Sequence, residues 1–294
     1  MIVNENEPMS KHTSFKVGGA ARYFIKVEDN EELKTAIAQA REKRLPHFIL
    51  GNGTNLLVSD KGYDGVVITL AGVFSAIEDS GNGSFKVGAA TPLGRFARTA
   101  MKLGFAGIHK LAGIPGTLGG AIYMNAGAYG QEIGTCCTQV TILDCDGNIR
   151  TVSSTDCAFG YRQSIFQKDK ATILSATFQL PTANAQGKSV ADLEAELAEC
   201  MAKRKATQPL NMPNAGSTFK RPEGYFAGAL IEQAGLKGRS VGGAQVSEKH
   251  AGFIVNTGGA TAADILALIG IVQDEVEARF GVRLETEVRI LGEG

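Results

Sequence analysis

Residues 111–131, LAGIPGTLGGAIYMNAGAYGQ, form the most informative stretch of the chain. The stretch carries no charge, yet it contains glycines, a proline and Asn125, which an ordinary apolar core segment does not need. A glycine has no Cβ and lets the backbone come close to a large ligand. Clustered N–H groups without a nearby carboxylate suit an anion such as a pyrophosphate. We therefore expect an anion cradle built from the amides of Gly113, Gly116, Gly119, Gly120, Gly127 and Gly130.

Two other interpretations of this stretch have to be weighed. A membrane-spanning helix also needs about twenty uncharged residues, but Pro115, Asn125 and the glycines weaken a helix, and no second apolar span of that length occurs. Alternatively, the glycines only permit tight packing of a short helix. Sequence chemistry disfavours the membrane helix and leaves the cradle and the tight packing open.

Composition limits the class of protein. With 294 residues, 44% hydrophobic and 20% charged, the chain has enough apolar material for about two domains. Thirty basic residues balance thirty acidic ones, so we expect neither a nucleic acid nor a membrane as partner. The five cysteines show no C-x-x-C spacing and the four histidines are scattered, so we expect no disulfide framework and no metal. Acidic residues near the N-terminus do not fit a secretory signal, and we expect a cytoplasmic protein.

The first clear element is a βαβ-like unit with a strand at 23–27, a helix at 30–43 and a strand at 47–50. The loop that follows, Gly51–Asn55, begins Gly-Asn-Gly, as a dinucleotide-binding Rossmann motif would. However, Leu56 stands where the third glycine belongs, and 56–58 has the pattern of a strand instead of a helix. A phosphate-binding loop of another fold is therefore expected here.

The middle of the chain alternates strands and helices. Its expected strands span 66–70, 84–87, 140–143, 149–152 and 171–180, with a two-residue hairpin turn at Asp146-Gly147. Its expected helices start with Pro92 in the first turn and with Ser189 as a cap, and the second runs through Lys205. A domain boundary is expected near 203–213. Beyond it, helices at 226–235 and 261–280 and strands at 252–256 and 287–291 predict a smaller α+β domain.

Three polar residues stand out as candidates for chemistry. Arg162, flanked by aromatic residues, has the fork geometry to bind a carboxylate, although a surface ion pair is the commoner role. Ser217 lies beside a glycine in a turn and can pass a proton, but most loop serines only satisfy backbone groups. Glu287 opens the last expected strand with Arg289 on the same face, where it either acts as an acid or pairs with that arginine.

Seven motifs, in order, cover nearly the whole chain. They are HTSFKVGG at 12–19, LGNGTNLLV at 50–58, AGIPGTLGGA at 112–121, YRQS at 161–164, AGSTFK at 215–220, GGAQVSEKHAGF at 242–253 and LETEVR at 284–289. Together they resemble the UDP-N-acetylenolpyruvoylglucosamine reductase family. The first three alone would indicate only the wider group of flavoproteins with a two-part FAD domain.

The resemblance implies an α+β fold. A two-part FAD-binding domain of the vanillyl-alcohol-oxidase/PCMH type is followed by a smaller α+β substrate domain. The expected segments are 1–70 for the first FAD-binding subdomain, on which the C-terminal tail can pack, 71–205 for the second, and 206–294 for the substrate-binding domain.

The resemblance also implies the reaction. An NADPH-dependent oxidoreductase of this family is a flavoprotein that reduces the enolpyruvyl ether of the UDP-sugar to UDP-N-acetylmuramate. The reaction is a cytoplasmic step of peptidoglycan synthesis, and so it serves cell wall biogenesis, cell shape and cell division. Hydride passes from non-covalently bound FAD, and a serine supplies the proton. A monomer is expected, with the UDP-sugar and NADPH as its small-molecule partners.

Residue roles carry over by motif. Arg162 and Glu287 are expected to polarise the substrate carboxylate region, and Ser217 is expected to deliver the proton. The residues expected to bind the flavin are Gly51, Asn52, Gly53, Thr54, Asn55, Gly119, Gly120 and Gly127. The residues expected to contact the substrate are Tyr161, Lys205, Arg221 and Gln245.

Some positions depart from the family pattern. His109-Lys110 stands where an acidic residue and an aromatic are common, and Thr286 replaces a common proline. The chain also lacks a tyrosine-bearing insertion, which indicates the shorter subclass. Two alternative functions remain: an FAD oxidase of the same fold acting on an alcohol, and a flavin carrier without a proton donor. The motifs of the C-terminal third argue against both.

Overall fold

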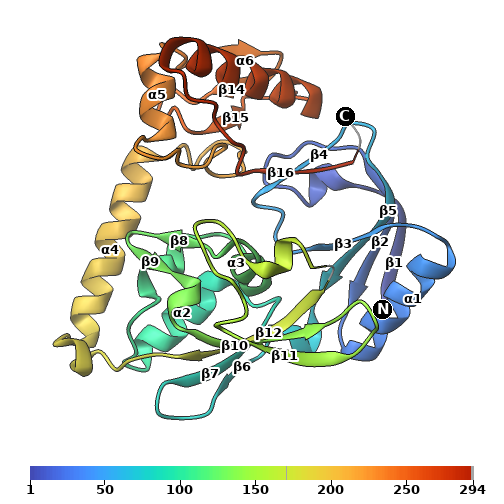
Figure 1. Ribbon diagram of the computed structural model, residues 1–294, viewed down its shortest axis with the longest axis vertical. Helices are drawn as coiled ribbons and strands as arrows, with labels where there is room; N and C mark the ends of the chain where they lie inside the picture. Colours follow the sequence, from blue (N-terminus) through green and yellow to red (C-terminus); the bar gives the residue numbers. More distant parts are fainter. Residues whose placement is uncertain (170, 293–294) are drawn as a thin grey trace. The chain divides into compact units, whose positions relative to one another are not determined.

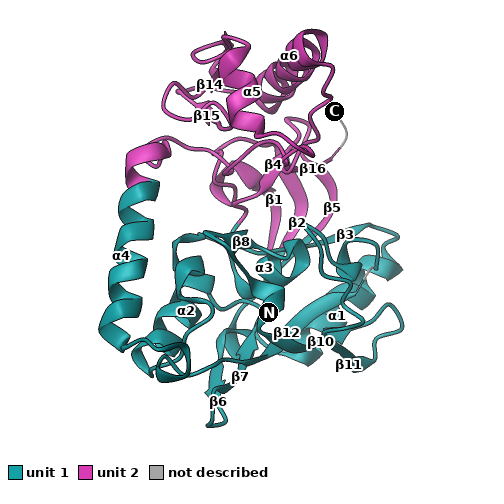
Figure 2. Cartoon of the chain, turned by 60° about the vertical axis from the view of Figure 1, so that its left-hand side comes forward, with its two compact units in different colours: residues 1–3, 25–52, 67–204 teal, residues 4–24, 53–66, 205–294 magenta. Residues whose placement is uncertain are grey.

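The computed structural model describes residues 1–169 and 171–292. Two compact units emerge, drawn in different colours in Figure 2. Unit 1 comprises Met1–Val3, Ile25–Asn52 and Val67–Arg204, and unit 2 comprises Asn4–Phe24, Gly53–Val66 and the chain from Lys205 onward. Residue 170 of the expected second FAD subdomain and residues 293–294 of the expected substrate domain lie outside the described residues.

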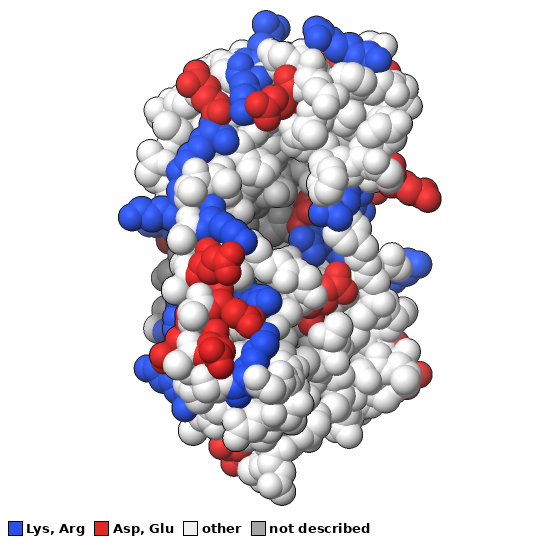
Figure 3. All heavy atoms as spheres, turned by 90° about the vertical axis from the view of Figure 1, so that its left-hand side faces the viewer, with Lys and Arg blue, Asp and Glu red and all other residues white. Residues whose placement is uncertain are grey.

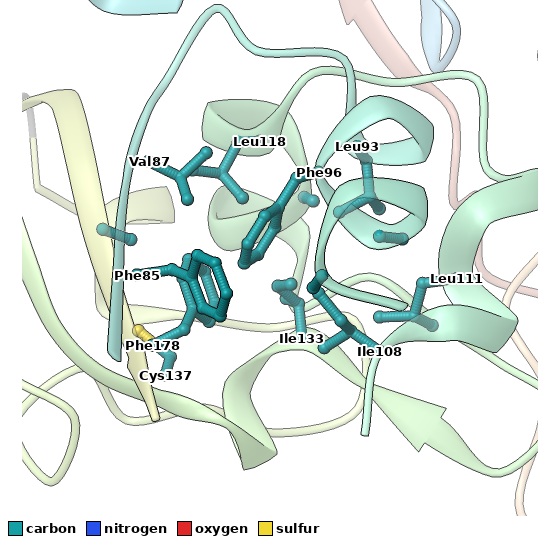
Figure 4. Packing of buried hydrophobic residues seen from close by; sticks show 14 of the residues in the cluster. Phe85, Val87, Leu93, Phe96, Ile108, Leu111, Leu118, Ile133, Cys137 and Phe178 are labelled. Carbon is teal, nitrogen blue, oxygen red and sulfur yellow. The ribbon is translucent and has the colours of Figure 1, made fainter. Parts of the chain in front are cut away.

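A five-stranded antiparallel sheet forms the centre of unit 1, in the order β11-β10-β12-β7-β6 (Figure 1). Its strands are β6 (Ile77–Asp79), β7 (Ser84–Gly88), β10 (Cys137–Leu143), β11 (Ile149–Ser153) and β12 (Thr172–Gln179). The helices α2 (Leu93–Lys102) and α3 (Leu118–Met124) pack against this sheet. Figure 4 shows Phe96 of α2 beside Phe85 and Phe178 of the sheet, and the centroids of Phe96 and Phe178 are 4.9 Å apart. Burial of these rings fixes α2 on the sheet.

A four-stranded sheet has the order β1-β2-β5-β3. Its strands are β1 (Ile2–Pro8), β2 (Ala20–Val27), β3 (His47–Leu50) and β5 (Tyr63–Leu70), of which β1, β2 and β5 continue from one unit into the other. The expected first helix is confirmed as α1 (Asn30–Glu42), where the Asp29 side chain accepts from the Glu32 N–H at 2.9 Å. That cap satisfies an N–H that has no partner within the helix.

Unit 2 carries the C-terminal helices and strands. They are α5 (Ala227–Gln233), β13 (Ser240–Val241), β14 (Ala244–Val246), β15 (Ile254–Asn256), α6 (Ala262–Phe280) and β16 (Arg289–Leu291). The long expected helix is confirmed as α6, which starts with a capping box between Thr261 and Asp264 and ends at Gly281 with φ +68°. The Asp60 carboxylate accepts from the N–H groups of Ala262 and Ala263 at 2.8 Å each, which stabilises the start of α6.

The remaining elements are short, apart from one helix. The helix α4 (Val190–Thr207) begins in unit 1, where the hydroxyl of Ser189 caps it by accepting from the Asp192 N–H at 3.2 Å. The others are β4 (Leu56–Val58), β8 (Gly127–Ala128), β9 (Gln131–Glu132), and the 3-10 turns η1 (Met9–Lys11), η2 (Gly72–Ser75), η3 (His109–Gly113), η4 (Ile133–Thr135), η5 (Ile165–Gln167) and η6 (Asn184–Gln186).

The compact units divide the chain differently from the three expected segments. β16 pairs in parallel with β4, Arg289 opposite Leu56, so the C-terminal tail does pack on a segment of the first 70 residues. Phe15, Val17 and Leu57 also join the apolar core around α5 and α6. Long-range strand pairing and shared burial therefore place residues 4–24 and 53–66 in unit 2, whereas the expected segment 1–70 kept them with α1.

Three local expectations were wrong. Pro92 has ψ 126°, which is extended, so α2 begins at Leu93 and the proline is its cap and not part of its first turn. In the β10–β11 hairpin Leu143 pairs with Ile149, so residues 144–148 form a loop longer than two residues. The Asp144 carboxylate closes that loop by accepting from two N–H groups. The last strand starts at Arg289, so Glu287 precedes it and strand alternation does not orient Glu287.

The surface carries both signs of charge. Figure 3 shows basic and acidic side chains interspersed on the face that it draws. Of the helices that the structure describes, none has the length and apolar character needed to cross a bilayer. Within residues 1–169 and 171–292, no cluster of three or more His, Cys, Asp and Glu side chains could hold a metal ion.

Candidate active site

The loop after β3 lies against the uncharged stretch. A Cβ added to Gly51 would lie 2.6 Å from Thr117 Oγ1, and the Asn52 side-chain amide donates to the Pro115 carbonyl at 2.8 Å. Only glycine permits this approach. The N–H groups of Asn52, Gly53 and Thr54 find no acceptor among the described residues. The two segments that the sequence assigned to one anion therefore meet, and amides in the loop remain available to a ligand.

The glycines of the uncharged stretch divide into two kinds. Gly119 lies in α3, where its N–H donates to the Ala89 carbonyl at 2.8 Å, and a Cβ on it would lie 3.0 Å from the Ala89 Cβ. The expectation that its amide is exposed was wrong, because α3 packs tightly on Ala89. Gly120 is exposed, and a Cβ there would meet only Thr117 Oγ1, at 3.5 Å, but its N–H donates to the same Thr117 hydroxyl at 3.4 Å, which caps α3. Tight packing thus describes Gly119, and the role of this stretch as an anion cradle stays a prediction.

We predict that Gly119→Ala lowers the stability of the protein and that Gly120→Ala lowers its affinity for FAD. The Gly119 variant should lose about 1–3 kcal/mol of unfolding free energy, because the added methyl group is forced against Ala89. The Gly120 variant should unfold at nearly the wild-type denaturant concentration but bind FAD more weakly, because its methyl group lies on an exposed residue that is expected to contact the flavin. Urea unfolding and flavin titration of the apoprotein measure both quantities. Equal FAD affinity for wild type and the Gly120 variant would remove Gly120 from the flavin site.

The other half of the loop belongs to unit 2. Gly53 has φ +61°, and a Cβ on it would lie 2.0 Å from the His12 carbonyl oxygen. The Ser14 N–H donates to the Gly53 carbonyl at 3.1 Å, and the His12 ring stacks on Phe24 with centroids 4.1 Å apart. The motif at 12–19 therefore packs against Gly53 of the Gly51–Asn55 loop.

Arg162 lies in a tight turn of unit 1. Gly160 and Gln163 exchange backbone hydrogen bonds of 3.0 and 3.1 Å, and Arg162 between them has φ +54°, a left-handed conformation that a side chain disfavours. The guanidinium donates to the Gly127 carbonyl at 3.2 Å and lies 5.1 Å from the Tyr161 ring centroid. Two expected site residues, Arg162 and Gly127, are therefore in contact. Gly127 itself pairs with Glu132 in the β8–β9 hairpin.

Unit 2 brings Ser217 and Glu287 onto paired segments. The Glu287 N–H donates to the Thr218 carbonyl at 2.8 Å, and the Lys220 N–H donates to the Glu285 carbonyl at 2.9 Å. The Asn55 side chain donates to the Glu287 carbonyl at 3.1 Å. The loop expected to bind the flavin, the expected proton donor and the expected carboxylate therefore lie on segments joined by one set of hydrogen bonds.

Thr286 causes no conflict in this framework. Thr286 pairs with Phe219, but the two hydrogen bonds of that bridge are made by the N–H groups of Glu287 and Lys220. A proline at 286, which has no N–H, would keep both bonds. The departure from the family pattern at this position therefore leaves the pairing intact.

The residues expected to contact the substrate remain predictions. The Arg221 guanidinium lies 4.4 Å from the Phe226 ring centroid, and the Lys205 carbonyl accepts from Lys249 Nζ at 2.6 Å. The Gln245 amide donates to Gly238 O at 3.3 Å and to Ser240 Oγ at 3.2 Å, so it already supports the β13–β14 hairpin. Tyr161, in unit 1, is half exposed at 49%.

Sequence reasoning missed Arg204. This α4 residue is half-buried, burial lowers the pKa of its guanidinium, and the guanidinium donates to the Gly113 carbonyl of the uncharged stretch. No carboxylate among the described residues pairs with it. A partly desolvated cation without an acidic partner suits a phosphate group. The basic run Lys203-Arg204-Lys205 is visible in the sequence, but the family resemblance assigns a role only to Lys205.

The unusual pair His109-Lys110 anchors α4. His109 is 1% exposed and its Nε2 donates to Glu196 at 3.1 Å, while Lys110 Nζ lies 3.0 Å from the same carboxylate. With Lys188 as a third partner, these groups lower the pKa of Glu196 to about 2. This departure from the family pattern therefore serves the contact between η3 and α4 in unit 1.

The fold and the glycine cradle define a class, the flavin-dependent oxidoreductases, since residues 21–153 match the FAD binding domain family. Residues 208–291 match the C-terminal domain of UDP-N-acetylenolpyruvoylglucosamine reductase. The chain belongs to the UDP-N-acetylenolpyruvoylglucosamine reductase family. This confirms the resemblance found from the seven motifs and the expected combination of an FAD domain with a smaller C-terminal domain.

Individual relatives support the assignment. The reductase of Caldanaerobacter subterraneus subsp. tengcongensis is 47% identical over 98% of this chain and 93% of its own length. That of Clostridioides difficile is 44% identical over 99% of this chain and 94% of its own. The crystal structure of the Thermus caldophilus reductase covers 99% of this chain and 100% of its own, with a TM-score of 0.85 and 34% identity.

Proposed function

We infer that the chain is an FAD-containing, NADPH-dependent enzyme that reduces UDP-N-acetylenolpyruvoylglucosamine to UDP-N-acetylmuramate in peptidoglycan synthesis. Family membership and the FAD-binding domain support the reaction. The single structural observation that carries the residue assignment is the pairing of residues 218–220, which follow Ser217 directly, with residues 285–288, to which Asn55 is bonded. It joins the expected acid–base groups to the loop expected to bind the flavin.

The residues of the cradle fit a dinucleotide diphosphate. Gly51 permits close approach at Thr117, the N–H groups of Asn52 to Thr54 have no acceptor among the described residues, and Arg204 supplies a cation. These residues would hold FAD without a covalent link. Bound FAD supplies the hydride chemistry that connects NADPH to the UDP-sugar.

The chain's own residues then handle the proton and the charge. Ser217 Oγ gives its proton to the substrate carbon next to the one that receives hydride. A serine hydroxyl is several pKa units too weak to do this alone at neutral pH, so it depends on its neighbours. Arg162 and Glu287 polarise the substrate carboxylate region, which stabilises the charge that develops before the proton arrives.

Recognition of the UDP-sugar would fall to the four remaining candidates. Lys205 and Arg221 carry the positive charge that a diphosphate or a carboxylate requires, and Tyr161 and Gln245 offer polar contacts. We also propose that the enzyme acts as a cytoplasmic monomer without nucleic acid or membrane partners. The balance of thirty basic and thirty acidic residues supports the absence of such polyanionic partners.

An anaerobic titration in two steps tests the function. The purified protein should be yellow, NADPH should bleach it, and UDP-N-acetylenolpyruvoylglucosamine should restore the colour. An oxidase would recover its colour only with oxygen, and a carrier would not be bleached by NADPH. A protein bleached by NADPH that does not respond to the UDP-sugar would contradict the proposed reaction.

A further inference from the structure

We propose that Asn125 is a positioning residue for Arg162. The proposal rests on the role of Arg162 in the proposed function, and adds a residue that the motifs did not select. Asn125 follows α3 directly, inside the uncharged stretch, whereas Arg162 lies in a turn 35 or more residues further along the chain. The side chain of Asn125 joins these two parts of unit 1.

The environment of Asn125 is unusual for an asparagine. It is only 2% exposed and adopts a left-handed conformation, φ +42° and ψ +58°, where α3 ends. Its Oδ1 accepts from the Gly134 N–H at 3.0 Å. Its Nδ2 donates to the Glu132 carboxylate at 3.0 Å and to the Gly160 carbonyl at 2.9 Å. One buried amide thus bonds to groups from two different loops, and its loss would remove the acceptor of the Gly134 N–H and one of the two donors to the Gly160 carbonyl.

These partners are the two supports of the Arg162 side chain. Gly160 closes the turn in which Arg162 is held at φ +54°, a conformation that persists only when surrounding contacts enforce it. Glu132 pairs with Gly127, whose carbonyl accepts from the Arg162 guanidinium at 3.2 Å. Asn125 therefore holds both the backbone that carries the arginine and the strand that receives its guanidinium.

A second side chain reinforces the same connection. Gln167 donates from Nε2 to the Arg162 carbonyl at 2.9 Å and to the Tyr123 carbonyl in α3 at 3.1 Å. The Ser164 hydroxyl, 1% exposed, also donates to the Tyr123 carbonyl at 2.7 Å. The end of α3 thus accepts the hydrogen bonds that hold the turn at 160–163 in place.

A matched control separates positioning from general stability. Asn256 in unit 2 is also a buried asparagine that ties loops: its Nδ2 donates to the Phe15 carbonyl at 3.0 Å, and its Oδ1 accepts from Gly258 and Ala260 N–H groups. The partners of Asn256 all belong to unit 2, whereas the Arg162 turn belongs to unit 1. Asn125→Ala and Asn256→Ala remove comparable sets of hydrogen bonds.

The test measures the two half-reactions of the holoenzyme by stopped flow. Asn125→Ala should slow flavin reoxidation by the UDP-sugar about 10- to 100-fold, because displacing a charged group by about 1 Å has an effect of this order. Reduction by NADPH should change less than about twofold. In an Arg162→Ala background, Asn125→Ala should slow reoxidation no further. Asn256→Ala, in contrast, should change the reoxidation rate by the same factor in the wild type and in the Arg162→Ala background.

Each outcome decides the question. If Asn125→Ala slows reoxidation equally with and without Arg162, the positioning role is wrong while the proposed role of Arg162 stands. If Arg162→Ala itself leaves reoxidation unchanged, the proposed function of that residue fails separately. Should Asn125→Ala be isolated without flavin, Gln167→Met, which keeps the side-chain volume, is tested in the same two backgrounds. If Gln167→Met slows reoxidation less in the Arg162→Ala background than in the wild type, the result supports the end of α3 as the support of the Arg162 turn. If it slows reoxidation by the same factor in both backgrounds, that role is overturned.

Discussion

Ser217→Ala should slow reoxidation of the flavin by UDP-N-acetylenolpyruvoylglucosamine about 10²- to 10⁴-fold, the usual contribution of a general acid. Reduction by NADPH should remain nearly normal, because no proton from Ser217 is needed in that step. Turnover would then be limited by the substrate step alone. Single-turnover absorbance measurements on the two half-reactions separate these effects.

The structure makes this a clean substitution. Ser217 is exposed, and its neighbour Thr218 makes the hydrogen bonds that hold this segment. The Thr218 N–H donates to the Gly252 carbonyl, its carbonyl accepts from the Glu287 N–H, and its hydroxyl accepts from the Ile254 N–H at 3.2 Å. Removing the Ser217 hydroxyl should therefore leave the backbone in place. The unfolding free energy should change by less than about 0.5 kcal/mol.

Ser217→Cys provides the matched variant. The thiol also carries a proton but is a stronger acid than a serine hydroxyl, so part of the lost rate should return, and the rate of reoxidation should fall as the thiol deprotonates at high pH. If both half-reactions of Ser217→Ala are normal, Ser217 is not the proton donor. A cysteine variant as slow as the alanine variant at every pH would also argue against it.

Local periodicity predicted most elements correctly because the signals are contained within each segment. The helices α1 and α6 are examples, since their apolar spacing and their caps involve residues within three or four positions of one another. The predicted two-residue hairpin turn was wrong because it, too, relied on a local signal. Asp146-Gly147 is a turn signal, but the carboxylate of Asp144 extends the loop. Boundaries depend on such side-chain competition, which a dipeptide pattern does not contain.

The site was predictable in its residue types and not in its distant contacts. The motifs selected Gly51 and the uncharged stretch, and the structure brings them together at Thr117. They did not distinguish Gly119, whose packing partner Ala89 lies some 30 residues earlier in the chain. Arg204 was missed, and Asn125 was noted as a polar residue of the uncharged stretch but given no role, because their partners, such as Gly113 and Gly160, are not revealed by spacing along the chain.

The Gly51–Asn55 loop also yields the prediction with the largest effect on binding of the cofactor. Gly53→Ala should give a protein isolated largely without FAD, with an unfolding free energy lower by about 3 kcal/mol or more. The added Cβ would lie 2.0 Å from the His12 carbonyl oxygen, which belongs to the backbone and cannot rotate away as a side chain would. The residue must also keep φ +61°, which costs a residue with a Cβ about 1–2 kcal/mol.

Neither side of the contact can move easily. The Ser14 N–H holds the Gly53 carbonyl, and the buried Thr13 hydroxyl donates to the Val17 carbonyl at 2.9 Å, so the segment 12–17 is fixed next to the loop. The alanine must therefore displace the loop. Displacement moves the N–H groups of residues 52–54, which we propose hold the diphosphate, and FAD affinity falls with them.

Gly147→Ala isolates the conformational part of this cost. Gly147 has φ +85°, but nothing lies within 4 Å of a Cβ built there, in the β10–β11 loop. This control should lose only the 1–2 kcal/mol of a left-handed alanine and keep its flavin. The flavin-to-protein absorbance ratio and urea unfolding of both variants give the comparison. If Gly53→Ala retains full flavin and loses no more stability than Gly147→Ala, the contact with His12 does not shape the flavin loop.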